Sequence, residues 1–467
     1  MSGSKRSRRN SRLKRWTGWN EMEKYVEYVE KHRQLILDAL DYIWKNPEIG
    51  YKEWKTHRYL AEAFEKLGYE LKLAGNIPGF TAEVDTGRPG PTVLVFGEMD
   101  GLVIPEHPEA DPETGAVHSC GHCAQVAALL GLAAALKEPG VLDEMCGKIR
   151  LCAVPAEELI DIEWRLQQRS KGTIRYLGGK AEFLYRGLLD DVDLAFMVHT
   201  SGGASGTGSC NGGSNGLIAK TVCFEGVSAH AGGAPHKGVN ALYAANLALN
   251  AINALRETFQ DNAHIRVHPI ITHGGSSVNA IPDRVTIESY VRGADMDSIA
   301  MVNKKVNRAI AASAAAIGAK AHIVDFPGYW PRNNFPPFVK LFGEAMEQVM
   351  DTFYYNPAGW GTGCSDMGDI SSLMPAIHPY AGGATGTEHG DDYQISDPET
   401  ACVKSAEGQL IALKLLLENG AVRAKEIVEA YEPFFKSKEE YFAYVDRLDM
   451  DKQMVSYEGD QVVLDFA

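Results

Sequence analysis

Long hydrophobic runs are missing from this sequence, and its longest apolar stretch, Ala124 to Leu136, is short and rich in alanine. A membrane-spanning helix needs about 20 consecutive apolar residues, so no segment is predicted to cross a membrane. The eight cysteines are spaced irregularly over 467 residues, which excludes the disulfide framework of a small secreted protein. We therefore expect a soluble protein of the reducing cytoplasm, where a cysteine beside histidines is a metal ligand or a redox group.

Basic residues are concentrated at the N-terminus. Residues 1–20 carry a cluster of Lys and Arg with no apolar segment behind it, so they are predicted to form a solvated, disordered tail instead of a secretory signal. The whole chain has a formal net charge of −15. An acidic protein is a poor partner for nucleic acid, and a small molecule is the expected ligand.

Strands and helices are predicted to alternate in the first half of the chain. Buried strands are expected at 92–96, 148–154 and 193–198, with a buried helix over 124–136 between the first two. This alternation is typical of a mostly parallel sheet covered by helices. A chain of this length also predicts more than one domain.

A change of pattern follows the Gly- and Ser-rich run at 201–216, which we interpret as a hinge. Residues 217–325 are predicted to run strand, helix, strand, strand, helix, strand, the order of a ferredoxin-like α+β domain. We therefore predict a discontinuous α/β catalytic domain, residues 21–212 and 328–467, interrupted by a smaller domain over 213–327.

Polar residues follow three of the predicted strands at the edge where ligands bind in parallel sheets. Glu157 and Glu158 come after the second strand, and His199 ends the third. Cys120 and His122 lie two residues apart in a loop, and thiolate, imidazole and carboxylate are the ligands that zinc-like metals prefer. Such a metal lowers the pKa of a bound water to about 7, while one glutamate of an adjacent pair can transfer protons.

Six segments in this order resemble the dinuclear metallopeptidase and amidohydrolase family, which includes aminoacylases, hippurate hydrolase, the plant auxin-conjugate hydrolases and p-aminobenzoyl-glutamate hydrolase. The resemblance extends from about Glu21 to Leu415. The segments are Gly97-Glu-Met-Asp100, His118-Ser-Cys-Gly-His122, Pro155-Ala-Glu-Glu158, Val198-His199, Gly226-Val-Ser-Ala-His230 and Ser365-Asp-Met-Gly-Asp369.

The resemblance implies two divalent metal ions, Zn, Mn or Co, and a general acid/base at Glu157. The last ligand matches His389, in Thr387-Glu-His-Gly390, with His378 as the alternative. The implied metal ligands are Cys120, His122, Glu158, His199 and His389.

In that family the inserted domain is a lid that also forms the contact of a homodimer. The resemblance implies that His230 reaches the partner's site and stabilises the oxyanion, while Asn279 and Arg292 hold a substrate carboxylate. The implied activity is hydrolysis, by a metal-bound hydroxide, of an amide bond in an N-acyl amino acid, an aryl-glutamate or a dipeptide-like substrate.

Two departures from the family pattern concern the metal loop. Cys123 stands where many members have Asp, and Glu98-Met-Asp100 stands where the metallopeptidase branch has His-x-Asp, so Glu98 and Asp100 are not counted as ligands. Cys120-Gly-His-Cys123 also permits a thiol-disulfide oxidoreductase, although that alternative gives the glutamates no role. A non-catalytic binding or assembly subunit on the same fold is the other alternative.

Overall fold

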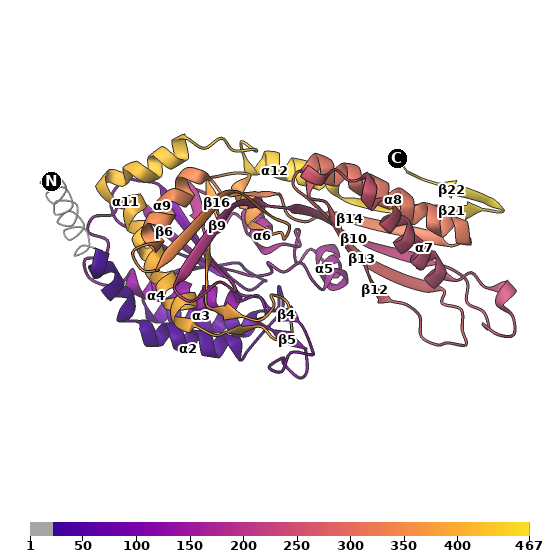
Figure 1. Ribbon diagram of the computed structural model, residues 1–467, viewed down its shortest axis with the longest axis horizontal. Coiled ribbons are helices and arrows are strands. Elements are labelled where there is room, and N and C mark those ends of the chain that lie inside the picture. Colours follow the sequence, from indigo (N-terminus) through magenta and orange to yellow (C-terminus); the bar gives the residue numbers. More distant parts are fainter. Residues whose placement is uncertain (1–21, 467) are drawn as a thin grey trace, which may run out of the picture.

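The computed structural model describes residues 22–466, which form two domains side by side (Figure 1). The basic segment 1–20 lies outside the described residues. A six-stranded sheet of order β1-β2-β6-β3-β7-β17 runs through the larger domain. Its inner strands are parallel, and β2 and β1 close one edge antiparallel. The strands are β1 (Leu71–Leu73), β2 (Phe80–Asp85), β3 (Thr92–Glu98), β6 (Lys148–Val154), β7 (Leu194–Phe196) and β17 (Ala376–Ile377).

Helix α4 (His122–Ala135) is the centre of the larger domain. All of its residues are buried, because apolar side chains surround the whole helix and it packs between β3 and the outer helices α2 and α11. This confirms the buried helix and the parallel strands expected from the sequence. The other helices of this domain are α2 (Arg33–Trp44), α3 (Trp54–Lys66), α5 (Ile162–Ser170), α6 (Gly179–Tyr185), α9 (Pro336–Met346), α10 (Met367–Ser371) and α11 (Ser405–Glu429).

The predicted hinge at 201–216 is wrong, because residues 207–214 form a strand, β9 (Thr207–Ser214). It pairs with β16 (Thr352–Gly361), β15 (Arg332–Asn333) and β18 (Tyr380–Ala381), and β18 also pairs with β8 (His199–Thr200). A Cβ at Gly212 or Gly213 would meet a backbone oxygen of a neighbouring strand at 2.3 Å. These glycines therefore allow close strand packing and do not mark a flexible linker.

The smaller domain has the predicted ferredoxin-like order. Strand β10 pairs with β13 on one side and β14 on the other, and helices α7 and α8 pack on this sheet. The elements are β10 (Gly216–Glu225), α7 (Ala241–Ala254), β11 (Arg266–Val267), β12 (Ile270–His273), β13 (Arg284–Gly293), α8 (Met296–Ile317) and β14 (Lys320–Pro327).

The end of the chain joins this smaller domain. The sequence pattern predicts that residues 328–467 belong to the catalytic domain, but β21 (Met450–Glu458) pairs with β14 and continues into β22 (Gln461–Leu464) (Figure 1). Met454 and Val455 are buried there, so the hairpin covers an edge strand that would otherwise be exposed. The helix before it is α12 (Lys438–Val445).

Within residues 22–466, none of the helices has both the length and the apolar character needed to cross a membrane.

Two pairs of short strands lie in the loops of the larger domain. They are β4 (Leu102–Val103) with β5 (Ala116–Val117), and β19 (Ala384–Thr385) with β20 (Gln394–Ile395).

Candidate metal centre

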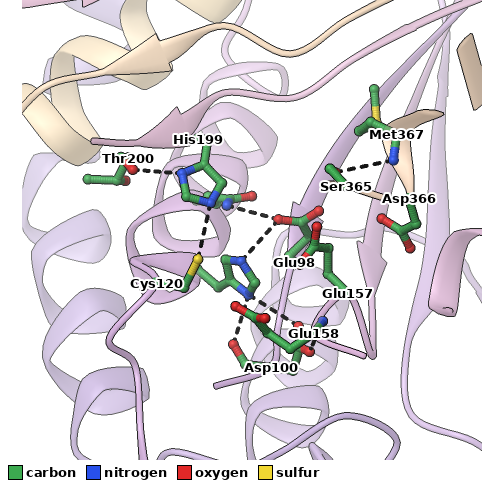
Figure 2. A network of polar contacts seen from close by, with 12 residues as sticks. Glu98, Asp100, Cys120, Glu157, Glu158, His199, Thr200, Ser365, Asp366 and Met367 are labelled. Atoms are coloured by element: carbon green, nitrogen blue, oxygen red, sulfur yellow. Dashed lines mark hydrogen bonds and ion pairs between the residues drawn. The ribbon is translucent and has the colours of Figure 1, made fainter. Parts of the chain in front are cut away.

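Five segments bring soft and charged side chains to one end of the central sheet, and Figure 2 shows those that carry Glu98, Cys120, Glu157 and His199. Glu98 ends β3, Glu157 and Glu158 follow β6, and His199 begins β8. The loop before α4 supplies Cys120, and the first residue of that helix is His122. His389 comes from the loop between β19 and β20.

The predicted ligands form overlapping groups whose donor atoms lie within 4.8 Å of one another. Cys120 Sγ lies 3.4 Å from His199 Nε2, and His389 Nε2 lies 3.3 Å from Glu158 Oε1. The groups are Cys120, His122 and His199; Cys120, Glu158 and His389; and His122, Glu157 and Glu158. Because each group shares a member with the next, the arrangement fits two neighbouring cations.

Within residues 22–466, two donor atoms in this cluster make no hydrogen bond of good geometry, although each lies 3.3 Å from a charged or ionisable side chain. His122 Nε2 and Glu158 Oε1 are both buried, and a buried polar atom without a partner is costly. Divalent cations would satisfy both atoms, and thiolate, imidazole and carboxylate are suitable ligands for them. The residues present therefore fit a dinuclear metal site.

The loop that carries His389 is tied to the cysteine loop by two hydrogen bonds. The amide of His389 donates to the carbonyl of Ser119 at 3.0 Å, and the Ser119 hydroxyl donates to the carbonyl of Gly390 at 2.8 Å. His389 itself has a φ of 62°, an unfavourable conformation for a non-glycine residue. His378 belongs to none of the donor groups formed by residues 22–466 and stacks instead on His199, with ring centroids 5.4 Å apart.

A buried charged network lies behind the ligands. Lys180 donates hydrogen bonds to both Glu98 and Asp366, and all three side chains are fully buried. Glu98 also accepts a hydrogen bond from Gln125 at 3.0 Å and lies 3.3 Å from His122 Nε2. Sequence reasoning did not find Lys180, because a single lysine in a helix carries no signal of such contacts.

Asp100 supports two of the predicted ligands. Its Oδ1 lies 3.2 Å from Nδ1 of His122, and its Oδ2 accepts the backbone amide of Glu158 at 2.8 Å. Asp100 is absent from the donor groups formed by residues 22–466, so it is placed to orient the predicted ligands and not to bind a cation itself. Asp100 lies two residues beyond the end of β3, and this position at the end of a parallel strand was the feature of the sequence that could have pointed to it.

The two adjacent glutamates have opposite electrostatic environments. Burial, together with the charges of Glu98, Glu158 and Asp366, raises the pKa of Glu157 well above its usual value. Burial also acts to raise the pKa of Glu158, but the close contact with His389 and the charge of its ring lower it to about 2. Glu158 is thus suited to bind a cation, and Glu157 to hold a proton.

The donor cluster opens into a cavity of about 430 Å³. Cys120, Glu157, Glu158, His199 and His389 line one part of it, and Arg292 of β13 lines another. His230 and Asn279 are not among its lining residues. They are exposed on the smaller domain, next to each other, since the amide of Ala231 donates to the carbonyl of Asn279 at 2.9 Å.

Cys123 belongs to none of the donor groups that residues 22–466 form. It lies in the hydrophobic core on α4, and burial raises the pKa of its thiol to about 12. A reactive redox cysteine needs the opposite shift, since the thiolate is the nucleophile. The structure therefore gives no support to an oxidoreductase with a Cys120–Cys123 pair.

Comparison with known proteins agrees with this geometry. Residues 212–317 match the peptidase dimerisation domain. The chain is 30% identical over 331 residues to indole-3-acetyl-aspartic acid hydrolase of Enterobacter agglomerans, covering 66% of this chain and 70% of that protein. It is 28% identical over 400 residues to the Xaa-Arg dipeptidase of Homo sapiens, covering 80% of this chain and 81% of that protein.

A solved structure has the same fold. It is a dinuclear metal-binding peptidase of the M20 family from Bacillus subtilis, with a TM-score of 0.59 and 22% identity over 82% of this chain and 98% of that one. Together with the sequence relatives, this defines the class of protein as metal-dependent hydrolases of amide bonds. The chain belongs to the M20 peptidase family.

Proposed function

We propose that the protein hydrolyses the amide bond of an N-acyl amino acid, an aryl-glutamate or a dipeptide-like substrate. The observation that supports this is the single cavity that joins Glu157 and the donor cluster to the guanidinium of Arg292. A planar guanidinium binds a carboxylate through two parallel hydrogen bonds. Arg292 holds the free carboxylate of the substrate, and the amide lies near Glu157.

Cys120, His122, Glu158, His199 and His389 would hold two divalent cations, Zn, Mn or Co. When bound, these ions supply an activated water and polarise the amide carbonyl. Glu157 removes a proton from the attacking water and then delivers it to the leaving nitrogen. The backbone around Glu157 is held on both sides, because Tyr329 donates to its carbonyl oxygen and the amide of Ala156 donates to Glu53 Oε1 at 2.8 Å.

The smaller domain is proposed to form a homodimer and to complete the partner's site. His230 and Asn279 are exposed and far enough from the cavity of their own chain to be absent from its lining. In a dimer, His230 stabilises the oxyanion in the partner's site, and Asn279 contributes to carboxylate binding.

The free cysteines of the described chain support a reducing location, the cytoplasm.

Glu157→Gln tests the assignment of the general acid/base. The variant should retain its metal while turnover falls by at least about 10²-fold, because a positioned proton carrier contributes that much. The readouts are metal content per chain and the rate of hydrolysis of N-acyl amino acids. Glu163→Gln on α5, outside the cavity lining, is the matched control. Near-normal turnover in Glu157→Gln would remove Glu157 from this role.

A further inference from the structure

A second guanidinium lines the same cavity. Arg332 lies on β15, and its side chain is only 3% exposed. Both Arg332 and Arg292 contribute to the cavity wall, and the Nε atom of each is buried with no hydrogen-bond partner in the part of the chain that the structure describes. Among the ion pairs formed by residues 22–466, neither guanidinium has an Asp or Glu as its partner.

The two guanidinium groups lie near one wall residue, Cys364. Burial raises the pKa of the Cys364 thiol to about 12, and the charges of Arg292 and Arg332 both act to lower it. Cys364 lines the cavity as well. Both positive charges therefore belong to the same region of the binding site.

Within residues 22–466, Arg332 has neutral side-chain partners, Tyr380 and Asn211, and no carboxylate. Its Nη2 lies 3.5 Å from Oδ1 of Asn211, an oxygen that also accepts a hydrogen bond from Asn334 Nδ2 at 3.2 Å. A buried charge is costly when it is not paired with an opposite charge. An anion that enters the cavity would remove this cost.

We propose that the substrate carries two carboxylates, and that Arg332 binds the second one. This inference rests on the proposed function, in which Arg292 holds the first. The leaving group is then a dicarboxylic amino acid, aspartate or glutamate, released from its acyl group. The same pair of positive charges disfavours a basic side chain such as that of an Xaa-Arg dipeptide.

The test compares substrates that differ only in the second carboxylate. N-acyl-aspartate and N-acyl-glutamate, each with acetyl, benzoyl and indole-3-acetyl groups, are measured against the asparagine and glutamine analogues. At least one acid should exceed its amide by about 10- to 100-fold in kcat/KM, the range for hydrogen bonds between charged groups. Arg332→Gln should remove this preference, so that the acid and its amide analogue have similar kcat/KM.

Two controls keep the result interpretable. Arg332→Lys retains the positive charge and should keep part of the preference, and Arg308→Gln, on the exposed face of α8, should behave as wild type. Binding of free aspartate, glutamate and their amides to the metal-loaded protein is measured by calorimetry. This second readout does not depend on turnover. A protein that binds free aspartate or glutamate but hydrolyses none of the N-acyl substrates would contradict the proposed function and leave the role of Arg332 in binding intact.

Two outcomes would overturn the inference. In the first, wild type shows no preference for either acid in hydrolysis or in binding. In the second, Arg332→Gln weakens the acids and their amides equally, which would mean that both guanidinium groups bind one carboxylate.

Discussion

Asp100 contacts His122 through both its main chain and its side chain. Nδ1 of His122 lies 2.9 Å from the carbonyl oxygen of Asp100 and 3.2 Å from its Oδ1. With Nδ1 engaged in this way, Nε2 is the ring nitrogen left to bind a cation. The same carboxylate accepts the amide of Glu158, so one side chain contacts two of the predicted ligands.

Asp100→Ala should therefore weaken metal binding without removing a ligand. Loss of a residue that orients metal ligands typically lowers affinity by about 10- to 100-fold. Competition with a chelator of known affinity measures the change. Asp85→Asn, at the exposed end of β2, is the control. Unchanged metal affinity in Asp100→Ala would show that the contact is not needed to orient His122.

The two cysteines of the metal loop should respond differently to substitution. Cys120→Ala removes a predicted ligand that two donor groups share, so the purified protein should contain less than the full complement of two ions. Cys123→Ala removes a side chain of the hydrophobic core and should retain its metal, with a loss of roughly 1 kcal/mol in the free energy of unfolding. Elemental analysis of both variants decides between ligand and core residue. Full metal content in Cys120→Ala would show that the ligand set is misassigned.

Features encoded locally were the ones that could be predicted from the sequence. The continuous apolar run of α4 marks a buried helix, and the strands β6 and β7, which precede Glu158 and His199, mark the edge of the sheet where these residues gather. Contacts between distant segments were not predictable. Lys180 and Asp366 form a hydrogen bond although they are 186 residues apart in the sequence. Arg332 can be assigned a role in binding only because it lines the same cavity as Arg292.

Two predictions from the sequence were wrong because they also depend on contacts between distant segments. Glycine usually signals a turn, and the glycines of β9 were interpreted as a hinge, although the neighbouring strands leave no room there for a Cβ. The hairpin of β21 and β22 was assigned by its position in the chain. Pairing with β14, more than 120 residues earlier, places it in the other domain.

Glu407 on α11 predicts that the stability of the protein depends on pH. Burial and the nearby carboxylates of Glu30 and Glu399 raise its pKa from 4.5 to about 8. Between these two values the folded chain keeps the proton and the unfolded chain has lost it, so the free energy of unfolding falls as pH rises through this window.

Glu407→Gln should remove this dependence, because the amide imitates the protonated acid. At pH 8 the variant should be more stable than wild type by roughly 2–4 kcal/mol, while at pH 4 the two should be similar. Urea unfolding at several pH values measures the difference. Glu429→Gln, exposed on the same helix, is the control. Parallel curves for wild type and Glu407→Gln would contradict this explanation.

Mixed dimers test whether His230 acts in the partner's site. Chains with His230→Ala and chains with Glu157→Gln should each be nearly inactive alone. If each site combines Glu157 of one chain with His230 of the other, a mixed dimer contains one intact site. An equal mixture after exchange of subunits should then recover about a quarter of wild-type activity, since about half of the dimers are mixed and each has one working site of two. Exchange is verified by mass spectrometry of the intact dimers. If each chain used its own His230, each site of a mixed dimer would carry one of the two substitutions and both sites would be impaired. Mixed dimers without activity would therefore show that His230 does not act across the dimer.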